Sequence, residues 1–398
     1  MKKLLFSSSM ITLFVMGINF LFKIYLSYHI SKEEIGLFWT FLDLISIGIM
    51  LFSGFKDSLI RAYDKKDFHK VLYWYGISFL VMALVVVIAE SIYFEILDFR
   101  YPLYFLIVLF VLNAVMIFFS YLNASYKNYK IMLFEKLVSA VGLVSAFFVF
   151  SQFTDKITAL FFAFSFSYII RVVYITYFSN IKWSVERSKP KEVSEFVKNT
   201  IYSGGMYFFS GLFISMSGIV ILKLFQDTTV LAEYQVVVKS IFFSLVAVFV
   251  YPLNTFTFPQ ISKLISEKKG AEIKRIEKIL VRYLFVFLLL LLAGTFFTKF
   301  IIAFVFPDAY LESYTMLNLL LPFLPFIAYT TFALNIIKAY DRFDLALYIR
   351  VAGTLSFFIS IYLFYKVGMS ATTIVYSLDI SFFMMFGLSY YFKRKVLA

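Results

Sequence analysis

Two basic residues occupy the same place in two apolar stretches of the sequence. Lys136 lies in "YKIMLFEKLVSAVGLVSAFFVF" (residues 129–150), seven residues after its first aromatic, and Arg350 lies equally far into "FDLALYIRVAGTLSFFISIYLF" (residues 343–364). Each stretch is long and apolar enough to cross a membrane, where a charged side chain costs roughly 2.5 to 3.5 kcal/mol. Ammonium and guanidinium groups bind phosphate, the latter through two parallel hydrogen bonds. The matched pair therefore predicts a receiving site for an anionic headgroup.

Four more basic residues fall within apolar stretches. Arg171, like the matched pair, lies on the side that the charge distribution described below indicates is cytoplasmic, and we expect it to face a water-filled cavity. Lys23 and Lys223 lie near the outer ends of their stretches. For these two, a role in the path of the ligand and simple extension of the side chain to the lipid headgroups are both open. Lys239, in the outer part of its stretch, falls between these cases.

Acidic residues within apolar stretches are fewer. Asp43, Asp379 and Glu90 are candidates for taking up and releasing a coupling ion, since intramembrane carboxylates are functional by default. Asp43 and Asp379 are equally open to being buried partners of basic residues, and Glu135 to being a helix-start charge beside Lys136. We expect no bound cofactor or metal, and transport coupled to H⁺, to Na⁺ or to the membrane potential. The excess of cations favours an anionic ligand.

The composition places these residues in a membrane protein. Of the 398 residues, 62% are hydrophobic and only 15% are charged, which is too apolar for a soluble globular protein. The chain has no cysteine and two histidines, which excludes disulfides, thiolate metal sites and cysteine nucleophiles and leaves too few ligands for a histidine-based metal site. No phosphate-binding glycine loop or nucleophile constellation stands out, so the sequence indicates a transporter and not an enzyme.

Twelve runs of about 20 mostly apolar residues predict twelve membrane-spanning helices and an all-α, polytopic fold. The first run follows two lysines and has no small-residue cleavage site, so we expect it to be retained as a span. The fifth and sixth runs are separated only by "QFTDKI". The centres of the twelve runs lie near Phe14, Ile45, Val85, Val111, Val144, Ser167, Phe213, Val246, Leu290, Pro325, Phe358 and Met384.

Basic residues segregate between alternate connecting segments. With the N-terminus inside the cell, 26 of the 37 Lys and Arg residues lie in inner segments, 5 lie in outer segments, and the remaining 6 lie within spans. Because cytoplasmic loops carry the excess of Lys and Arg, both termini are predicted to be cytoplasmic. The same asymmetry explains the net charge of +13 as topology and contact with anionic lipid, so no nucleic-acid partner is expected.

The two matched stretches belong to a larger internal repeat. "SLIRAYDKKDFHKVLYWYGISFLV" after the second span resembles "ISKLISEKKGAEIKRIEKILVRYLFVF" after the eighth, each a charged entry into the next span. The repeat predicts two pseudo-symmetric lobes of six spans, residues 1–180 and 201–398, joined by a cytoplasmic linker at 181–200. Since six is even, the lobes have the same orientation, as expected for repeats related by an axis along the membrane normal with a cavity between them.

Glycine and proline positions predict where helices pack closely or bend. Gly204, Gly211 and Gly218 recur every seven residues on one face of the seventh span, which permits close helix approach. Pro252 in the eighth span and Pro322 and Pro325 in the tenth are expected to kink their helices, while the first lobe has no proline within a span. Bending is therefore predicted to concentrate in the second lobe.

The segments "FKIYLSYHISKEEIGLF", "SLIRAYDKK" and "YQVVVKSIFFSLVAVFVYPLNTFTFPQISKLISEKKG" resemble the polysaccharide flippases of the multidrug, oligosaccharidyl-lipid and polysaccharide exporter superfamily. The resemblance implies two six-helix bundles that open alternately to each side of a bacterial inner membrane. It implies transport of a polyprenyl-pyrophosphate-linked glycan, for an O-antigen-like surface polysaccharide, with membrane lipid and polysaccharide polymerase machinery as partners. The segment "SMSGIVILKLF" lacks the acidic residue that many relatives carry in the seventh span.

Three other functions are compared with a flippase. A multidrug exporter of organic cations shares the expected fold and is the alternative, although the basic residues disfavour it. A glycan polymerase or ligase should show a long outer loop with catalytic acids or histidines, and the outer loops here are short. A purely structural scaffold would not need six basic residues within its spans.

Overall fold

The computed structural model describes residues 2–63, 68–126, 128–179, 190–267, 269–340 and 342–397, and the secondary structure within them is helical. Eleven helical segments of this described part are long and apolar enough to cross a membrane. Helices α11 (Gly270–Gly294) and α12 (Thr298–Val305) together make a twelfth, bent by 62° at the break between them. Each of the twelve predicted centres falls within one of these segments, including the closely spaced fifth and sixth, so the all-helical polytopic fold is confirmed.

The chain divides into two compact units. Unit 1 comprises residues 1–30 and 41–208, and unit 2 comprises residues 31–40 and 209–398. Helices α2 (Lys32–Leu51) and α8 (Pro190–Val220) each contribute to both units. Of the predicted linker at 181–200, residues 181–189 lie outside the described residues, and the rest begins α8. The lobe boundaries at 180 and 200 stay a prediction.

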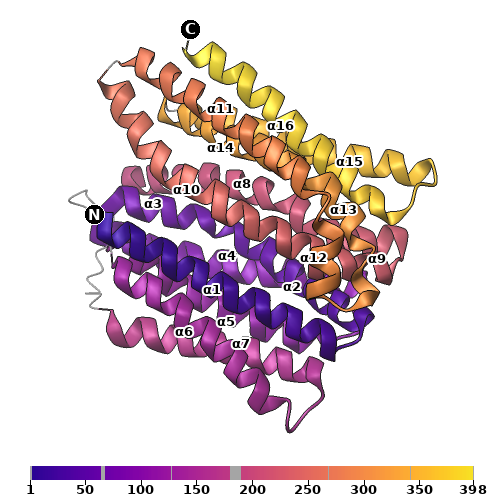
Figure 1. Ribbon diagram of the computed structural model, residues 1–398. Coiled ribbons are helices and arrows are strands. Elements are labelled where there is room, and N and C mark those ends of the chain that lie inside the picture. The colour runs from indigo at the N-terminus through magenta and orange to yellow at the C-terminus, as the bar shows by residue number, and fades with distance from the viewer. Residues whose placement is uncertain are drawn as a thin grey trace. The chain divides into compact units, whose positions relative to one another are not determined.

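Unit 1 consists of long helices that run side by side (Figure 1). Besides parts of α2 and α8 it contains α1 (Lys2–His29), α3 (Ser53–Tyr63), α4 (Phe68–Leu97), α5 (Leu103–Ser125), α6 (Tyr129–Phe150) and α7 (Lys156–Phe178). Helix α6 packs against α7 and α1, and α7 also packs against α5. The Asp155 carboxylate caps α7 by accepting hydrogen bonds from the backbone N–H groups of Ile157 and Thr158 at 3.1 and 3.0 Å. Burial disfavours its ionisation, but these bonds outweigh burial and hold the pKa of Asp155 below its usual value.

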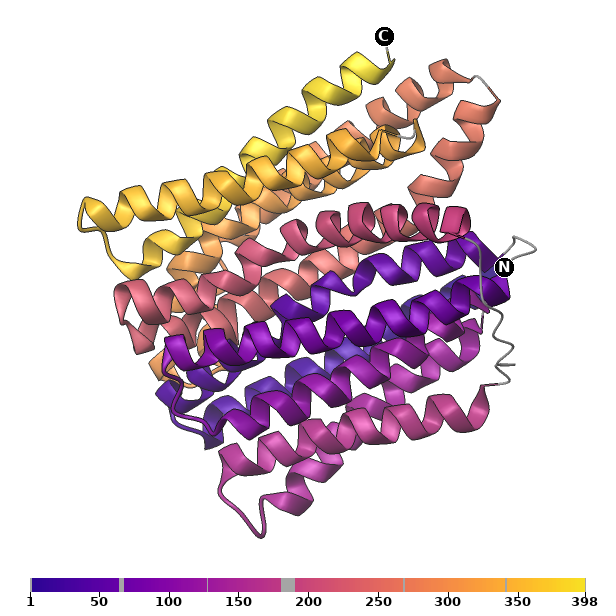
Figure 2. The same cartoon turned by 180° about the vertical axis from the view of Figure 1, so that it is seen from behind.

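Unit 2 is built around helices α10 (Lys239–Ser266), α14 (Leu324–Ala339), α15 (Phe343–Lys366) and α16 (Ile374–Leu397). The end of α10, the start of α11 and the end of α16 lie at one end of this unit, and the α15–α16 connection lies at the other (Figures 1 and 2). Its elements after α8 are the π-helix Ile221–Phe225, α9 (Thr228–Ala232), the π-helix Glu233–Val238, α10 (Lys239–Ser266), α11, α12, the 3₁₀ turn Asp308–Tyr310, α13 (Ser313–Leu320), the 3₁₀ turn Leu321–Phe323, α14 (Leu324–Ala339), α15 (Phe343–Lys366), the 3₁₀ turn Ala371–Thr373 and α16 (Ile374–Leu397).

The second span is interrupted at Phe52, between α2 and α3, where Gly54 crosses Gly204 of α8. A Cβ on Gly54 would meet the carbonyl oxygen of Thr200 and the backbone of Gly204, and a Cβ on Gly204 would meet the Leu51 carbonyl oxygen. Only a residue without a side chain permits this approach. Two of the three predicted stripe glycines, Gly204 and Gly218, therefore sit at close contacts, while Gly211 is half-buried.

The predicted proline sites behave differently from one another. Pro322 lies in the 3₁₀ turn between α13 and α14, and Pro325 lies in the first turn of α14, so the tenth span changes its helix type there. Helix α10 runs as one element from Lys239 to Ser266, across Pro252. Because unit 1 has its own interruption at Phe52, breaks in the spans are not confined to the second half of the chain. Movement at any of these sites stays a prediction.

The Gly54–Gly204 crossing predicts the effect of adding one methyl group. Gly54→Ala should destabilise the protein by about 1 to 3 kcal/mol, because its Cβ would push backbone against backbone. Gly76→Ala is the matched control, since nothing lies within 4 Å of a Cβ on Gly76 in α4, and we expect it to be neutral or slightly stabilising. Thermal unfolding of the two purified variants checks the difference. Equal midpoints would contradict the close crossing.

Candidate functional site

A buried ion pair fixes one of the predicted basic residues in unit 1. The Arg171 guanidinium on α7 donates from Nη2 to Glu135 Oε1 on α6 at 2.6 Å, and Ser120 Oγ on α5 donates to the same oxygen at 2.9 Å. The Glu135 side chain is 1% exposed and that of Arg171 is 17% exposed. Within the described residues, Glu135 Oε2 and Arg171 Nε have no hydrogen-bond partner. Glu135 is thus the partner of Arg171, and the contact leaves most guanidinium donors for other acceptors.

Lys136 follows Glu135 in sequence and is exposed. The positive charges of Arg171 and of the half-buried Lys56 on α3 lie close enough to repel its ammonium group, and the negative charge of Glu135 attracts it. Asp57 lies close enough to act on Tyr121, as Arg171 does. We call Lys56, Asp57, Glu135, Lys136 and Arg171 the unit 1 basic cluster. Its three cations exceed its two carboxylates, which suits binding of an anion.

In unit 2, Arg350 occupies the position in α15 that Lys136 occupies in α6. Both helices begin at the first residue of the matched stretches, Tyr129 and Phe343, and each basic residue follows seven positions later. Arg350 is half-buried, and its Nη1 donates to Met385 Sδ on α16 at 3.5 Å. The guanidinium therefore contacts the neighbouring helix α16.

The other predicted cations are spread over several elements. Lys23 is half-buried in α1 of unit 1. Lys223 is exposed in the π-helix Ile221–Phe225, and Lys239 is half-buried at the first residue of α10, both in unit 2. The structure thus brings Lys136 and Arg171 together in unit 1 and places Arg350, Lys223 and Lys239 on three different elements of unit 2.

The three predicted ion-coupling carboxylates have different surroundings. Glu90 on α4 is 6% exposed, and its Oε1 accepts a hydrogen bond from the Gly48 backbone N–H on α2 at 2.9 Å. Asp43 on α2 is half-buried. Asp379 on α16 is 7% exposed, and within the described residues no hydrogen bond or ion pair reaches its carboxylate. Glu90 and Asp379 therefore meet one requirement of a coupling site, shelter from bulk water, and Asp43 meets it less fully.

Asp379 lines an apolar groove of about 900 Å³ in unit 2. The walls include four aromatic side chains and come from α13, the turn Leu321–Phe323, α15 and α16; among them are Leu319, Phe323, Phe364, Tyr376 and Phe383. An unpaired carboxylate in apolar surroundings is costly unless a proton or a cation neutralises it. The groove therefore suits a proton or a positively charged ligand.

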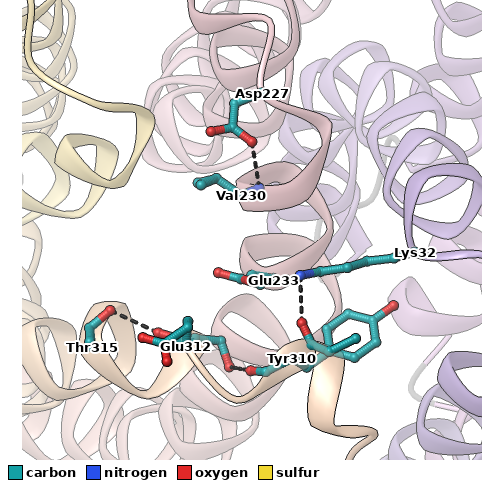
Figure 3. A network of polar contacts seen from close by, with 9 residues as sticks. Lys32, Asp227, Val230, Glu233, Tyr310, Glu312 and Thr315 are labelled. Atoms are coloured by element: carbon teal, nitrogen blue, oxygen red, sulfur yellow. Dashed lines mark hydrogen bonds and ion pairs between the residues drawn. The ribbon is translucent and has the colours of Figure 1, made fainter.

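A network that the sequence did not predict anchors the first residues of α2 within unit 2 (Figure 3). The Lys32 ammonium donates to Glu233 Oε1 at 2.7 Å and to the Ala309 carbonyl oxygen at 2.6 Å, and lies 5.3 Å from the centre of the Tyr310 ring. Burial, and then the Glu233 charge, raise the pKa of Tyr310 above its usual range. The Lys32 ammonium thereby joins α2 to the π-helix Glu233–Val238 and to the 3₁₀ turn Asp308–Tyr310.

The same face of α2 continues this docking at four-residue intervals. Gly36 lies so close to Ala232 that a Cβ added to Gly36 would be 3.0 Å from the Cα of Ala232. Thr40 Oγ1 accepts a hydrogen bond from Gln235 Nε2 at 3.1 Å. Residues four apart lie on one side of a helix, so the spacing of Lys32, Gly36 and Thr40 is a sequence signal for a shared face of α2. The elements that this face contacts, α9 and the π-helix Glu233–Val238, have no clear sequence signature.

A second unpredicted network lies at the opposite end of unit 2. The Lys393 ammonium on α16 contacts Glu277 Oε1 on α11 and donates to Tyr329 Oη on α14 at 2.8 Å, and Tyr329 Oη donates to the same Glu277 oxygen at 2.7 Å. Lys393 is 3% exposed. The sequence does not predict this network, because a count of basic residues on each side of a membrane cannot reveal a buried partner. The network ties three helices together.

The Lys32–Glu233 pair predicts a coupled effect of two substitutions. Lys32→Met should destabilise the protein by about 3 kcal/mol, because it leaves the Glu233 carboxylate buried and unpaired. Adding Glu233→Gln should restore much of the loss, since the amide needs no counter-ion. Thermal unfolding of the single and double variants measures the coupling, with Lys299→Met as the exposed control. Strictly additive effects would show that the two side chains do not depend on one another.

Comparison with known proteins agrees with this architecture. The family model described as "Polysaccharide biosynthesis protein" matches residues 2–265. Among curated proteins, none matches the chain.

Solved transporters share the fold at low sequence identity. A multidrug resistance transporter of the MATE family in an inward-facing conformation has a TM-score of 0.74 at 12% identity, covering 96% of this chain and 94% of that one. The lipid II flippase MurJ in an inward closed conformation has a TM-score of 0.73 at 14% identity, covering 98% and 88%. A MOP superfamily transporter from Pyrococcus furiosus has a TM-score of 0.67 at 13% identity, covering 100% and 96%. The chain belongs to the polysaccharide biosynthesis protein family and has the fold of MOP superfamily transporters.

Proposed function

We propose that this protein is a flippase that moves a polyprenyl-(pyro)phosphate-linked oligosaccharide across the bacterial cytoplasmic membrane by alternating access. The glycan would serve synthesis of an O-antigen-like surface polysaccharide, in cooperation with polysaccharide polymerase machinery. The family match and the fold shared with a lipid II flippase support this proposal. The observation that carries it is the unit 1 basic cluster, in which an exposed Lys136 lies beside an Arg171 held by Glu135.

The arrangement of the cluster fits recognition of a phosphate or diphosphate. Glu135 holds Arg171 through one donor, so the guanidinium is positioned before a ligand arrives and retains donors for phosphate oxygens. Lys136 adds a point charge that can follow a moving anion. Arg350, at the equivalent place in α15, is proposed to perform the same task in unit 2. With both termini in the cytoplasm, these groups receive the headgroup on the inner side, and Lys23, Lys223 and Lys239 receive it further out.

The first test removes the two matched cations. Lys136→Ala and Arg350→Ala should each reduce outward delivery of the lipid-linked glycan in proteoliposomes by roughly 10- to 100-fold, the value of a charge-assisted hydrogen bond. Arg350→Lys should rescue only in part, because a point charge cannot reproduce the guanidinium fork. Lys366→Ala is the control, since it removes one exposed charge at the end of α15. Undiminished flipping by the Lys136→Ala, Arg350→Ala double variant would refute the proposed role.

The membrane potential, acting mainly on the anionic headgroup, is proposed to drive transport. Moving one negative charge out of a negative-inside cell gains about 2.3 kcal/mol per 100 mV. Flipping should accelerate when a negative-inside potential is imposed in the cell-like orientation, and it should persist without a proton or sodium gradient. If Asp43, Glu90 or Asp379 instead carries a coupling ion, its amide variant should fail and transport at zero potential should require that ion's gradient. That second result would contradict the potential-driven scheme.

Export of organic cations is the second candidate, and the groove around Asp379 favours it. Apolar and aromatic walls with one carboxylate suit a lipophilic cation, which also interacts with aromatic faces. For the Pyrococcus furiosus transporter, reversed polarity of the binding pocket suggests a different function. In this protein the charge of the binding site likewise separates the two candidates, because a basic site suits an anionic headgroup and an acidic site suits an organic cation.

Binding of two ions of nearly equal size separates charge recognition from apolar contact. If the groove serves cation export, tetraphenylphosphonium should bind to protein in nanodiscs, and tetraphenylborate should not. Binding should weaken at least about tenfold in Asp379→Asn, and also in Gly387→Leu, whose side chain enters open space in the groove. Gly76→Leu is the control for an added side chain. Equal binding of both ions, or unchanged binding in Asp379→Asn, would count against an organic-cation site.

A further inference from the structure

Helix α11 carries a row of three basic residues on one exposed face. Lys274, Lys278 and Arg282 follow one another at intervals of four residues, and all three are exposed. Side chains four residues apart lie on the same side of a helix, and the row extends over about 12 Å at 1.5 Å per residue. We call these three residues the α11 basic row.

The opposite face of α11 packs against a hydrophobic core, so the basic row faces away from that core. Ile273 is fully buried in a core with Ile261 of α10 and Phe332 and Ile336 of α14. Further hydrophobic residues of α11, Ile276 and Leu280, pack against the same core. Because α11 is held along this side, the basic row cannot turn inward without exposing the core.

The carboxylates near the row are engaged elsewhere. Glu277, on the same helix, binds Lys393 and Tyr329. Glu267 forms ion pairs with Lys269 and Lys263, and the Lys269 ammonium also interacts with Glu272. Within the part of the chain that the structure describes, no hydrogen bond or ion pair reaches Lys274, Lys278 or Arg282. The three positive charges of the row are therefore available to a ligand at the surface of α11.

The exposed surface of α11 changes character directly after Arg282. On the face of the row, Phe285 is 61% exposed and Leu289 is 51% exposed. Tyr283 is 70% exposed and lies on another side of the helix. An aromatic ring with a hydroxyl group favours the boundary between headgroups and hydrocarbon. Phe285 and Leu289 lie three and seven residues after Arg282, so the order along this helix face is three cations followed by an apolar surface. This matches the order of headgroups and hydrocarbon at the edge of a bilayer.

We propose that the α11 basic row and the apolar surface after it bind an anionic membrane phospholipid. Its phosphate lies between Lys278 and Arg282, Lys274 draws in further negative headgroups, and its chains lie along Phe285 and Leu289. This lipid is resident rather than transported, so the site is separate from the proposed headgroup path. A zwitterionic lipid with the same chains matches the apolar surface but lacks the net charge that complements the row.

The test measures lipid binding and stability instead of transport. The full chain is exchanged into nanodiscs of phosphatidylcholine with rising fractions of phosphatidylglycerol of the same chain length, and bound lipid is counted by native mass spectrometry after release. We expect selective retention of phosphatidylglycerol and a rise in the unfolding temperature. In Lys278→Gln, Arg282→Gln the preference should fall at least about tenfold, since each juxtamembrane charge contributes several-fold to affinity.

The matched control removes the same charge at the same end of unit 2. Arg394 and Lys395 are exposed in the last turn of α16, whose Leu397 packs on the core that holds α11. Arg394→Gln, Lys395→Gln should retain the preference, and Lys278→Arg, Arg282→Lys should retain it with unchanged folding. Equal losses in both Gln pairs would show that only overall charge matters and would overturn the site. A stability rise produced by inorganic pyrophosphate alone would overturn it too, because the ligand would then be a free phosphate.

Discussion

A charged side chain that is buried away from water is costly unless an opposite charge pairs with it, and buried ionisable residues of this protein are arranged around that constraint. Three described networks satisfy it by pairing. Arg171 meets Glu135, Lys32 meets Glu233, and Lys393 meets Glu277. In each pair the two residues come from different helices, so neutralising a charge also joins two elements. Removing one partner would leave the other charge buried alone, which costs far more than the pair itself contributes.

Against that background, the groups that remain accessible or unpaired indicate function. Lys136 is exposed in the unit 1 basic cluster, where Glu135 holds the neighbouring Arg171. Asp379 lies in an apolar groove of unit 2 without a hydrogen-bond partner among the described residues. The first arrangement suits an anion and the second a proton or a cation. A flippase that receives a diphosphate headgroup would bind it at the unit 1 basic cluster. The groove around Asp379 would then bind a coupling ion or an organic cation.

The sequence predicted the spans well because it records hydropathy directly. All twelve centres fall within helical segments, and the starts of α6 and α15 at Tyr129 and Phe343 are those of the two matched stretches. It did not predict the interruption at Phe52, the 62° bend before α12 or the two π-helices, because these arise from packing between elements. The ion pairs of Lys32 and Lys393 were not predicted either, since counting charges on each side of a membrane cannot reveal an ion pair with a distant residue.

The central claim is that this protein carries an anionic lipid-linked glycan, and a three-substrate transport measurement tests it most directly. Proteoliposomes containing the protein are compared with protein-free liposomes for movement of a polyprenyl-diphosphate oligosaccharide, of the same oligosaccharide on an uncharged polyprenyl lipid, and of a lipophilic cationic dye. The account predicts protein-dependent movement of the diphosphate-linked glycan and little of the other two. Protein-dependent movement of the dye, with none of the diphosphate-linked glycan, would contradict it.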